Sequence, residues 1–150
     1  MTSVDRTAPS PRDAQRETIS FDFDLTHPPA KVWRALTEPA LLSEWLLPVV
    51  GLRLEPGAAF RFETQPYPGW DGVVNCRMLE IEPQRRIRYA WTVPFLDTEV
   101  TFTLAPTASG TRLSLVQSGF TPGQKREFGG ARYGWKMMGG KLVELLDRIP

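Results

Sequence analysis

Cysteine and histidine are almost absent from this chain of 150 residues, which contains one of each, Cys76 and His27. A single Cys excludes an intramolecular disulfide, and a single His excludes a His-cluster metal site and any mechanism that needs two imidazoles. We therefore expect no metal and no other cofactor. His27 precedes Pro28 at a predicted strand-to-helix junction, which favours a surface or capping role. Cys76 has no His or Cys companion nearby, which favours a buried structural thiol.

An excess of one charge is also missing. Eighteen Lys and Arg residues against seventeen Asp and Glu residues give a formal charge of +1. Such a balance supplies no field that would attract a nucleic-acid backbone or an acidic membrane surface, so we expect no nucleic-acid partner. The apolar runs are shorter than the roughly 18 residues of a membrane span, and the first residues lack the pattern of a signal peptide. These features predict a cytoplasmic protein without a membrane span.

The first sixteen residues differ in composition from the rest. Residues 1–16 carry Ser, Thr, Pro and alternating charges with almost no large apolar side chain. They cannot bury enough surface to offset the entropy lost on ordering, so we expect a flexible tail. Residues 17–150 are long enough to form one sizeable core, and we interpret them as a single domain.

Hydrophobic spacing predicts the elements of this domain. Ile19, Phe21, Phe23 and Leu25 alternate with polar residues, which is the period of a half-buried strand. Pro residues then favour two short helices, one over 29–37 and a second from Pro39 through Trp45. Residues 51–117 predict strands separated by turns, including a hairpin in which residues 55–57 join 52–54 to 60–62.

The last segment has helical spacing. Its apolar residues are three or four apart and comprise Trp135, Met138, Leu142, Leu145 and Ile149. They predict one long amphipathic helix with its apolar stripe facing the core. Gly134, Gly139 and Gly140 each cost roughly 1 kcal/mol relative to Ala inside a helix. We therefore expect close packing or cavity clearance at these three positions.

This order of elements predicts an α+β domain. A curved antiparallel sheet wraps around the long C-terminal helix, and two short helices follow the first strand. The long helix is the one element large enough to cover a face of the sheet. Because a bent sheet around a single helix tends to leave a gap, we expect a ligand cavity between them.

Several short motifs strengthen this interpretation because they follow one another in a recognisable order. They are 29–39 (PAKVWRALTEP), 42–45 (LSEW), 56–57 (PG), 60–62 (FRF), 72–74 (GVV), 80–83 (EIEP), 86–87 (RI), Trp91, 110–113 (GTRL), 118–120 (SGF) and 134–135 (GW). Together they span about 18–149, and the chain resembles the helix-grip proteins related to the C-terminal domain of the activator of the Hsp90 ATPase. No single motif is diagnostic.

The resemblance implies a START-like fold with a hydrophobic cavity. The superfamily includes lipid carriers, hormone receptors, plant allergens and polyketide aromatases, so the resemblance implies no particular reaction. The eukaryotic co-chaperone also has a separate N-terminal domain that binds the chaperone, and residues 1–16 are too few to supply one. We therefore do not expect Hsp90 activation to carry over.

Candidate cavity residues are mostly aromatic. The candidates are Trp45, Phe62, Asn75, Arg77, Tyr89, Trp91, Phe102, Gln117, Trp135 and Met138. Rings that line the gap would suit a flat or lipid-like molecule, with the Tyr89 hydroxyl as a polar handle. Packing in the core is the alternative interpretation of these rings. Gln117 stands where members of the family often have a His, which weakens an acid-base interpretation.

Two polar candidates lie on the strand that begins at Val73. Alternation places Asn75 and Arg77 on the same face as Leu79 and Ile81, and Cys76 on the other. If Leu79 and Ile81 face inward, Asn75 and Arg77 would orient a carboxylate, phosphate or carbonyl of a ligand. The alternative is that Arg77 lies near the end of the sheet and pairs with Glu63 or Glu99. The loop over 66–72 could be a cavity lid, a partner-binding knob or a stiff connector.

Three hypotheses of function follow. The first is a binding module without catalysis, which holds a small apolar or amphipathic molecule between the sheet and the C-terminal helix. The second is a protein-interaction or stress-response module that docks a partner such as a chaperone. The third, ranked lowest, is an enzyme of aromatase, cyclase or hydrolase type in which Arg77, Asn75 and Tyr89 polarise a carbonyl. No nucleophile and base stand at a recognisable spacing, so we assign no catalytic residue. Monomer and homodimer both stay open.

Overall fold

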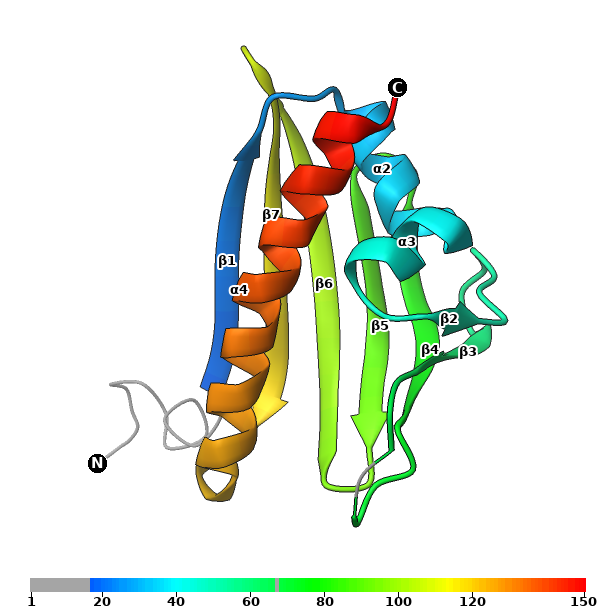
Figure 1. The fold of residues 1–150 in the computed structure, drawn as a ribbon, viewed down its shortest axis with the longest axis vertical. Coiled ribbons are helices and arrows are strands. Elements are labelled where there is room, and N and C mark those ends of the chain that lie inside the picture. The colour runs from blue at the N-terminus through cyan, green and yellow to red at the C-terminus, as the bar shows by residue number, and fades with distance from the viewer. Residues whose placement is uncertain (1–16, 67) are drawn as a thin grey trace, which may run out of the picture.

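Two layers make up the fold, a seven-stranded sheet and a set of helices that covers one of its faces (Figure 1). The computed structural model describes residues 17–66 and 68–150, so the predicted tail over 1–16 lies outside the described residues. The elements are β1 (Glu17–Leu25), α2 (Pro29–Thr37), α3 (Pro39–Trp45), β2 (Val49–Val50), β3 (Ala59–Glu63), β4 (Val73–Glu82), β5 (Arg86–Val93), β6 (Leu96–Thr107), β7 (Gly110–Phe120), the 3₁₀ turn η1 (Pro122–Gln124) and α4 (Lys125–Arg148). They confirm the predicted α+β helix-grip fold.

The strand order of the sheet is β1-β7-β6-β5-β4-β3-β2, and each neighbouring pair is antiparallel. β1 is therefore an edge strand that pairs with β7, which is the last strand in the chain. The strands from β3 to β7 form a meander, as the run of turns predicts. Helix α4 crosses the face of β1, β7 and β6, whereas α2 and α3 lie beside it over the upper part of the sheet as drawn in Figure 1.

Both short helices begin as their Pro residues predict. Pro29 and Pro39 occupy the first turns of α2 and α3, where a missing N–H costs no hydrogen bond. The indole Nε1 of Trp45 donates to the backbone oxygen of Ala35 at 2.8 Å, and this buried bond ties the two helices into a bent pair. Trp45 then packs edge-on against Phe102 of β6. This contact anchors the helix pair on the sheet.

The stripe predicted for α4 faces the sheet. Trp135, Leu142 and Leu145 are buried, and Ile149 lies one residue beyond the helix. Close packing explains Gly139, because a Cβ there would lie 2.5 Å from two ring carbons of Phe23 on β1. The same expectation is wrong for the other two helical positions. A Cβ at Gly134 would make an ordinary 3.8 Å contact, and one at Gly140 would meet no atom within 4 Å.

The strand predicted over residues 52–54 is wrong. The strand that pairs with β3 is β2, with Val49 opposite Phe62. The predicted turn exists, since the Ala58 N–H donates to the Glu55 oxygen at 3.1 Å and Gly57 has φ of 88°. However, the Gly57 N–H donates to Met78 on β4 at 2.7 Å. Because β2 pairs with β3 on the edge that the predicted strand would need, residues 52–54 run outside the sheet.

Candidate functional site

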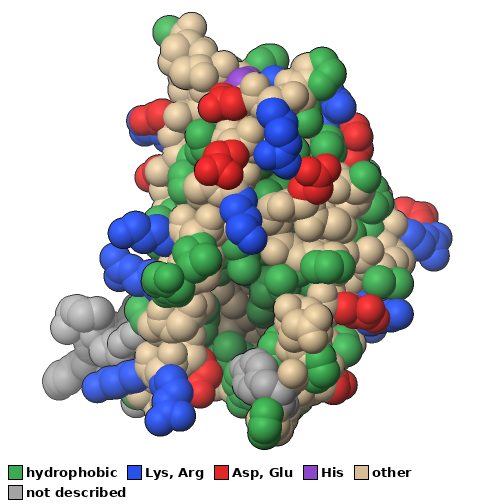
Figure 2. All heavy atoms as spheres, in the orientation of Figure 1, with side chains coloured by type: hydrophobic (Ala, Val, Ile, Leu, Met, Phe, Trp, Pro, Cys, Tyr) green, Lys and Arg blue, Asp and Glu red, His purple; other side chains and the backbone are tan. Residues whose placement is uncertain are grey.

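An apolar pocket opens between the first half of α4 and the end of the sheet where β5 turns into β6. Its volume is about 590 Å³, within the roughly 300–1,000 Å³ that is usual for small-molecule sites. The lining residues are Leu47, Trp70, Val74, Trp91, Val93, Phe95, Leu96, Arg126, Glu127, Gly130 and Ala131. Figure 2 shows a hollow bordered by hydrophobic side chains beside the lower part of α4. The site therefore lies in the layer between helix and sheet, where the sequence predicts a cavity.

The wall formed by α4 is built from small residues. Gly130 has no side chain, and Ala131 contributes one methyl group. A Cβ added at Gly130 would meet no atom within 4 Å, so the space beside it is open. Gly130 and Ala131 therefore add little bulk to the side of the pocket that α4 forms.

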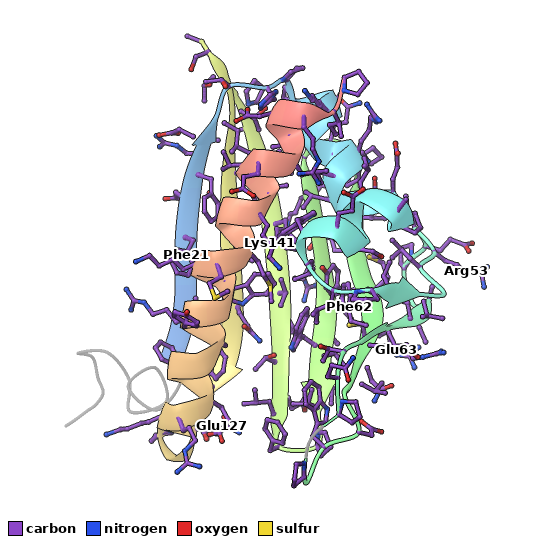
Figure 3. The ribbon with its side chains drawn as sticks, in the orientation of Figure 1. Phe21, Arg53, Phe62, Glu63, Glu127 and Lys141 are labelled. Atoms are coloured by element: carbon purple, nitrogen blue, oxygen red, sulfur yellow. The ribbon has the colours of Figure 1, made fainter. Side chains whose placement is uncertain are left out.

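The charged residues of the lining stand at the mouth. Arg126 and Glu127 belong to the first turn of α4, and Figure 3 labels Glu127 at that end of the helix. Arg126 is exposed and forms no ion pair with any residue within 17–66 and 68–150. The other nine lining residues are apolar or Gly. The pocket therefore combines an apolar interior with a polar rim.

Trp70 shows what the loop over 66–72 contributes. Its indole Nε1 donates to the Val73 backbone oxygen at 2.9 Å, and its ring packs edge-on against Phe95 with centroids 6.4 Å apart. Both residues line the pocket. Gly72 fixes the base of the loop, since its φ is 82° and a Cβ would lie 2.3 Å from the Thr64 oxygen. Trp70 thus forms part of the pocket wall.

Beyond the pocket, the predicted aromatic candidates form one continuous cluster. The closest ring pairs are Phe62–Trp91 (5.3 Å), Trp91–Trp135 (5.5 Å), Phe102–Trp135 (6.1 Å), Trp45–Phe102 (6.1 Å), Tyr89–Phe102 (6.2 Å) and Phe62–Tyr89 (6.3 Å). All except the half-buried Trp91 are at most 3% exposed. Met138 is half-buried and packs against this core. Trp91 therefore stands between the pocket and the closed core.

Gln117 is a buried polar member of this core. Its amide Nε2 donates to Thr98 Oγ1 at 2.9 Å, and its Oε1 accepts from Trp135 Nε1 at 2.7 Å. The Thr98 hydroxyl in turn donates to the Trp91 backbone oxygen at 2.8 Å. These bonds join β7, β6, α4 and β5. Gln117 thus fixes the Trp135 indole against the sheet.

The predicted inward orientation of Asn75 and Arg77 is wrong. Both are exposed, whereas Val74, Cys76 and Met78 face the core. A β-bulge between Met78 and Glu80 shifts the alternation by one residue, so that both Met78 and Ile81 pack against the core. Ile81 therefore faces the core, whereas Arg77, four residues earlier, faces the solvent. Arg77 Nη1 donates to the Gly57 oxygen at 2.7 Å, in place of the predicted pairing with Glu63 or Glu99.

Cys76 and Tyr89 are buried titratable residues, whereas His27 contacts a carboxylate near the end of the chain. Cys76 is buried, as predicted for a structural thiol, and burial raises its pKa to about 12. Burial also raises the pKa of Tyr89 well above its ordinary value, and nearby Cys76 adds to this shift. His27 Nε2 lies 2.9 Å from Asp147 Oδ1 and joins the end of α4 to the start of α2. Across the described part of the chain, no three His, Cys, Asp or Glu side chains cluster as a metal site would require.

Sequence reasoning missed most of the pocket wall. Of the ten predicted site residues, Trp91 lines the pocket, and Leu47, Val74, Val93, Leu96 and Ala131 were not candidates. The consecutive small residues at 129–131 in an otherwise amphipathic helix were the available signal.

Nowhere in residues 17–66 and 68–150 does a helix have the length and apolar character of a membrane span.

Comparisons with known proteins agree with this architecture. The family model for activator of Hsp90 ATPase homolog 1-like protein matches residues 26–147. A crystal structure of a Mesorhizobium loti protein is 39% identical with a TM-score of 0.83, and the match covers 89% of this chain and 99% of that one. A Chromobacterium violaceum protein is 30% identical (TM-score 0.73, covering 88% and 98%). A Nitrosomonas europaea protein is 27% identical (TM-score 0.73, covering 87% and 94%). No curated protein is significantly similar in sequence.

Proposed function

This chain belongs to the family of activator of Hsp90 ATPase homolog 1-like proteins, and we propose that it binds a small apolar or amphipathic molecule in the pocket beside α4. The observation that carries the proposal is the pocket itself, about 590 Å³ with an apolar lining. Burial of apolar surface there supplies the driving force for binding. The rim of Arg126 and Glu127 leaves the polar end of an amphipathic molecule in water.

The expected affinity is modest. A neutral probe such as N-phenyl-1-naphthylamine has 17 heavy atoms, and roughly 0.3 kcal/mol per heavy atom corresponds to about 5 kcal/mol. That free energy gives a dissociation constant on the order of 100 µM. Fluorescence titration suits this range because the probe brightens when it leaves water. Wild-type protein is expected to give a saturable increase.

A pair of matched variants tests where the probe binds. Ala131→Phe adds a ring to the pocket wall on α4, whereas Met137→Phe adds one to the exposed face of the same helix, where Met137 is 50% exposed. We expect Ala131→Phe to weaken binding about tenfold or more because the ring occupies the space of the probe. Met137→Phe is expected to leave binding unchanged. Equal affinities of the two variants, or no saturable signal with wild-type protein, would contradict the proposal.

The other hypotheses fare differently. The enzyme hypothesis loses its proposed constellation, since Asn75 and Arg77 lie on the opposite face of the sheet from Tyr89. Docking of a protein partner stays a prediction, as do the oligomeric state and the cytoplasmic location. The ligand-binding proposal differs from the docking hypothesis in one measurable respect. It predicts that purified protein alone binds the probe.

A further inference from the structure

Two hydrogen-bond donors on the inward face of β5, one in the pocket wall and one beyond it, have no partner among the described residues, and we propose that they recognise a neutral carbonyl oxygen on the bound molecule. The donors are the Tyr89 hydroxyl and the Trp91 indole N–H. This inference rests on the proposed function and deepens it, because it names the chemical class of the ligand: an apolar body whose buried end carries a ketone, ester or amide carbonyl.

The Tyr89 hydroxyl is the stronger observation. The residue is 2% exposed, and its oxygen makes no hydrogen bond within the described residues. Its ring lies among Phe60, Phe62 and Phe102, at centroid distances of 5.1, 6.3 and 6.2 Å. Buried hydroxyls nearly always have a partner, because an unpaired one loses its hydration without compensation. A phenylalanine would fill the same space without that loss, so the hydroxyl calls for an explanation.

Trp91 provides the second donor. The indole N–H groups of Trp45, Trp70 and Trp135 donate to protein oxygens at 2.7–2.9 Å. The indole of Trp91 makes no such bond to any residue that the structure describes, although it lines the pocket. An indole nitrogen is a donor and never an acceptor. A ligand that satisfies it must therefore present an acceptor.

The two donors lie on one path into the protein. Val93, Trp91 and Tyr89 share the inward face of β5, and residues two apart on a strand are roughly 6.6 Å apart. Val93 and Trp91 line the pocket, so Tyr89 is the next residue inward. Phe62, labelled in Figure 3, contacts both rings, at 5.3 Å from Trp91 and 6.3 Å from Tyr89. For one ligand to reach the Tyr89 hydroxyl from the pocket, the half-buried Trp91 ring must shift, and the proposal includes this movement.

The acceptor must be neutral. Burial raises the pKa of Tyr89, so its hydroxyl stays protonated and acts as a donor at physiological pH. A carboxylate at the same depth would lose its hydration without a cation to balance it. Arg126, the one cation of the lining, belongs to the first turn of α4 and is exposed, and Arg77 lies on the opposite face of the sheet. A carbonyl oxygen meets the requirement at lower cost.

The experiment compares two probes of equal shape, 2-acetylnaphthalene and 2-isopropenylnaphthalene, in which a C=CH₂ group replaces C=O. Each is titrated into wild-type protein, Tyr89→Phe and Tyr133→Phe. Tyr133 is a matched control because it is 67% exposed on α4. We expect Tyr89→Phe to weaken binding of the ketone about five- to tenfold, with binding of the hydrocarbon unchanged within twofold. Tyr133→Phe is expected to change neither.

Two further readouts separate recognition from packing. The C=O stretch of the bound ketone is expected at lower frequency in wild-type protein than in Tyr89→Phe, as a hydrogen-bonded carbonyl requires. Without ligand, Tyr89→Phe is expected to melt at the same or a higher temperature, because it removes an unpaired polar group. A lower melting temperature with unchanged affinity for the ketone would assign the hydroxyl to a buried water and overturn the inference.

The remaining outcomes are also decisive. Equal weakening of both probes by Tyr89→Phe would mean that the residue acts through packing, and the inference would be wrong while the pocket function stands. Failure of both probes to bind wild-type protein would overturn the proposed function and this inference together. The hydrocarbon probe thus distinguishes failure of the pocket from failure of carbonyl recognition.

Discussion

Gly139 packs closely against Phe23 of β1, and Gly139→Ala should not give the stability gain that Ala usually brings to a helix. A Cβ at this position would lie 2.5 Å from the Cε1 and Cζ atoms of Phe23 on β1. Carbon atoms in contact prefer separations of about 3.5–4.0 Å, so the ring or the helix must move by roughly 1 Å. Gly140 is the control, because a Cβ there meets no atom within 4 Å.

The expected magnitudes have opposite signs. Replacement of Gly by Ala inside a helix contributes about 1 kcal/mol of stability from backbone propensity alone. Gly140→Ala should therefore raise the free energy of unfolding by about 1 kcal/mol. At Gly139 the same gain is offset by overpacking, which costs roughly 1–3 kcal/mol. The net change is then between about zero and a loss of 2 kcal/mol, which places the two variants about 1–3 kcal/mol apart.

Urea denaturation, monitored by tryptophan fluorescence, measures both variants. Phe23→Leu provides a further check, because a shorter side chain at residue 23 should reduce the penalty of Gly139→Ala in a double-mutant cycle. If Gly139→Ala stabilised the protein as much as Gly140→Ala, the reasoning about the contact between α4 and β1 would be refuted.

Two further predictions concern the buried polar groups. Gln117→Leu should lower the free energy of unfolding by about 1–3 kcal/mol, since it leaves the Trp135 indole N–H unpaired, and Trp135→Phe in the same chain should recover part of that loss. An additive double variant in urea denaturation would argue against the bond. Stability should also fall from pH 9 toward pH 12, because the Cys76 thiol ionises near 9.0 in the unfolded chain and near 12 in the folded one, so the unfolded state binds fewer protons. Cys76→Val should reduce this slope by up to about 1.4 kcal/mol per pH unit, and an unchanged slope would contradict the assignment.

Local patterns were sufficient to predict most of the architecture. The alternation in β1 is visible from neighbouring residues alone. The same is true of the Pro residues that begin α2 and α3, and of the apolar stripe of α4 that includes Trp135 and Leu142. Each of these signals acts within one element. For that reason the order of elements and the fold class followed from the sequence.

The sequence predicted that a pocket lies between the sheet and α4, but it did not predict which residues line the pocket. Its walls come from β4, β5, β6, α4 and three connecting segments, so the lining depends on register and on helix placement, which no local pattern encodes. The bulge after Met78 is the clearest case. Simple alternation would place Ile81 and Arg77 on the same face of the sheet, whereas the bulge places them on opposite faces. The rings of Phe62 and Tyr89 were identified correctly as inward-facing, but they fill the core beyond the pocket.

Amide chemical-shift mapping tests the central claim most directly. Addition of N-phenyl-1-naphthylamine to ¹⁵N-labelled protein should shift the resonances of Val74, Trp91, Val93 and Gly130, which lie on β4, β5 and α4 and all line the pocket. The exposed Met137 serves as the internal reference and should stay in place. Shifts centred on the outer face of α4 around Met137, with the β4 and β5 resonances unmoved, would contradict the account.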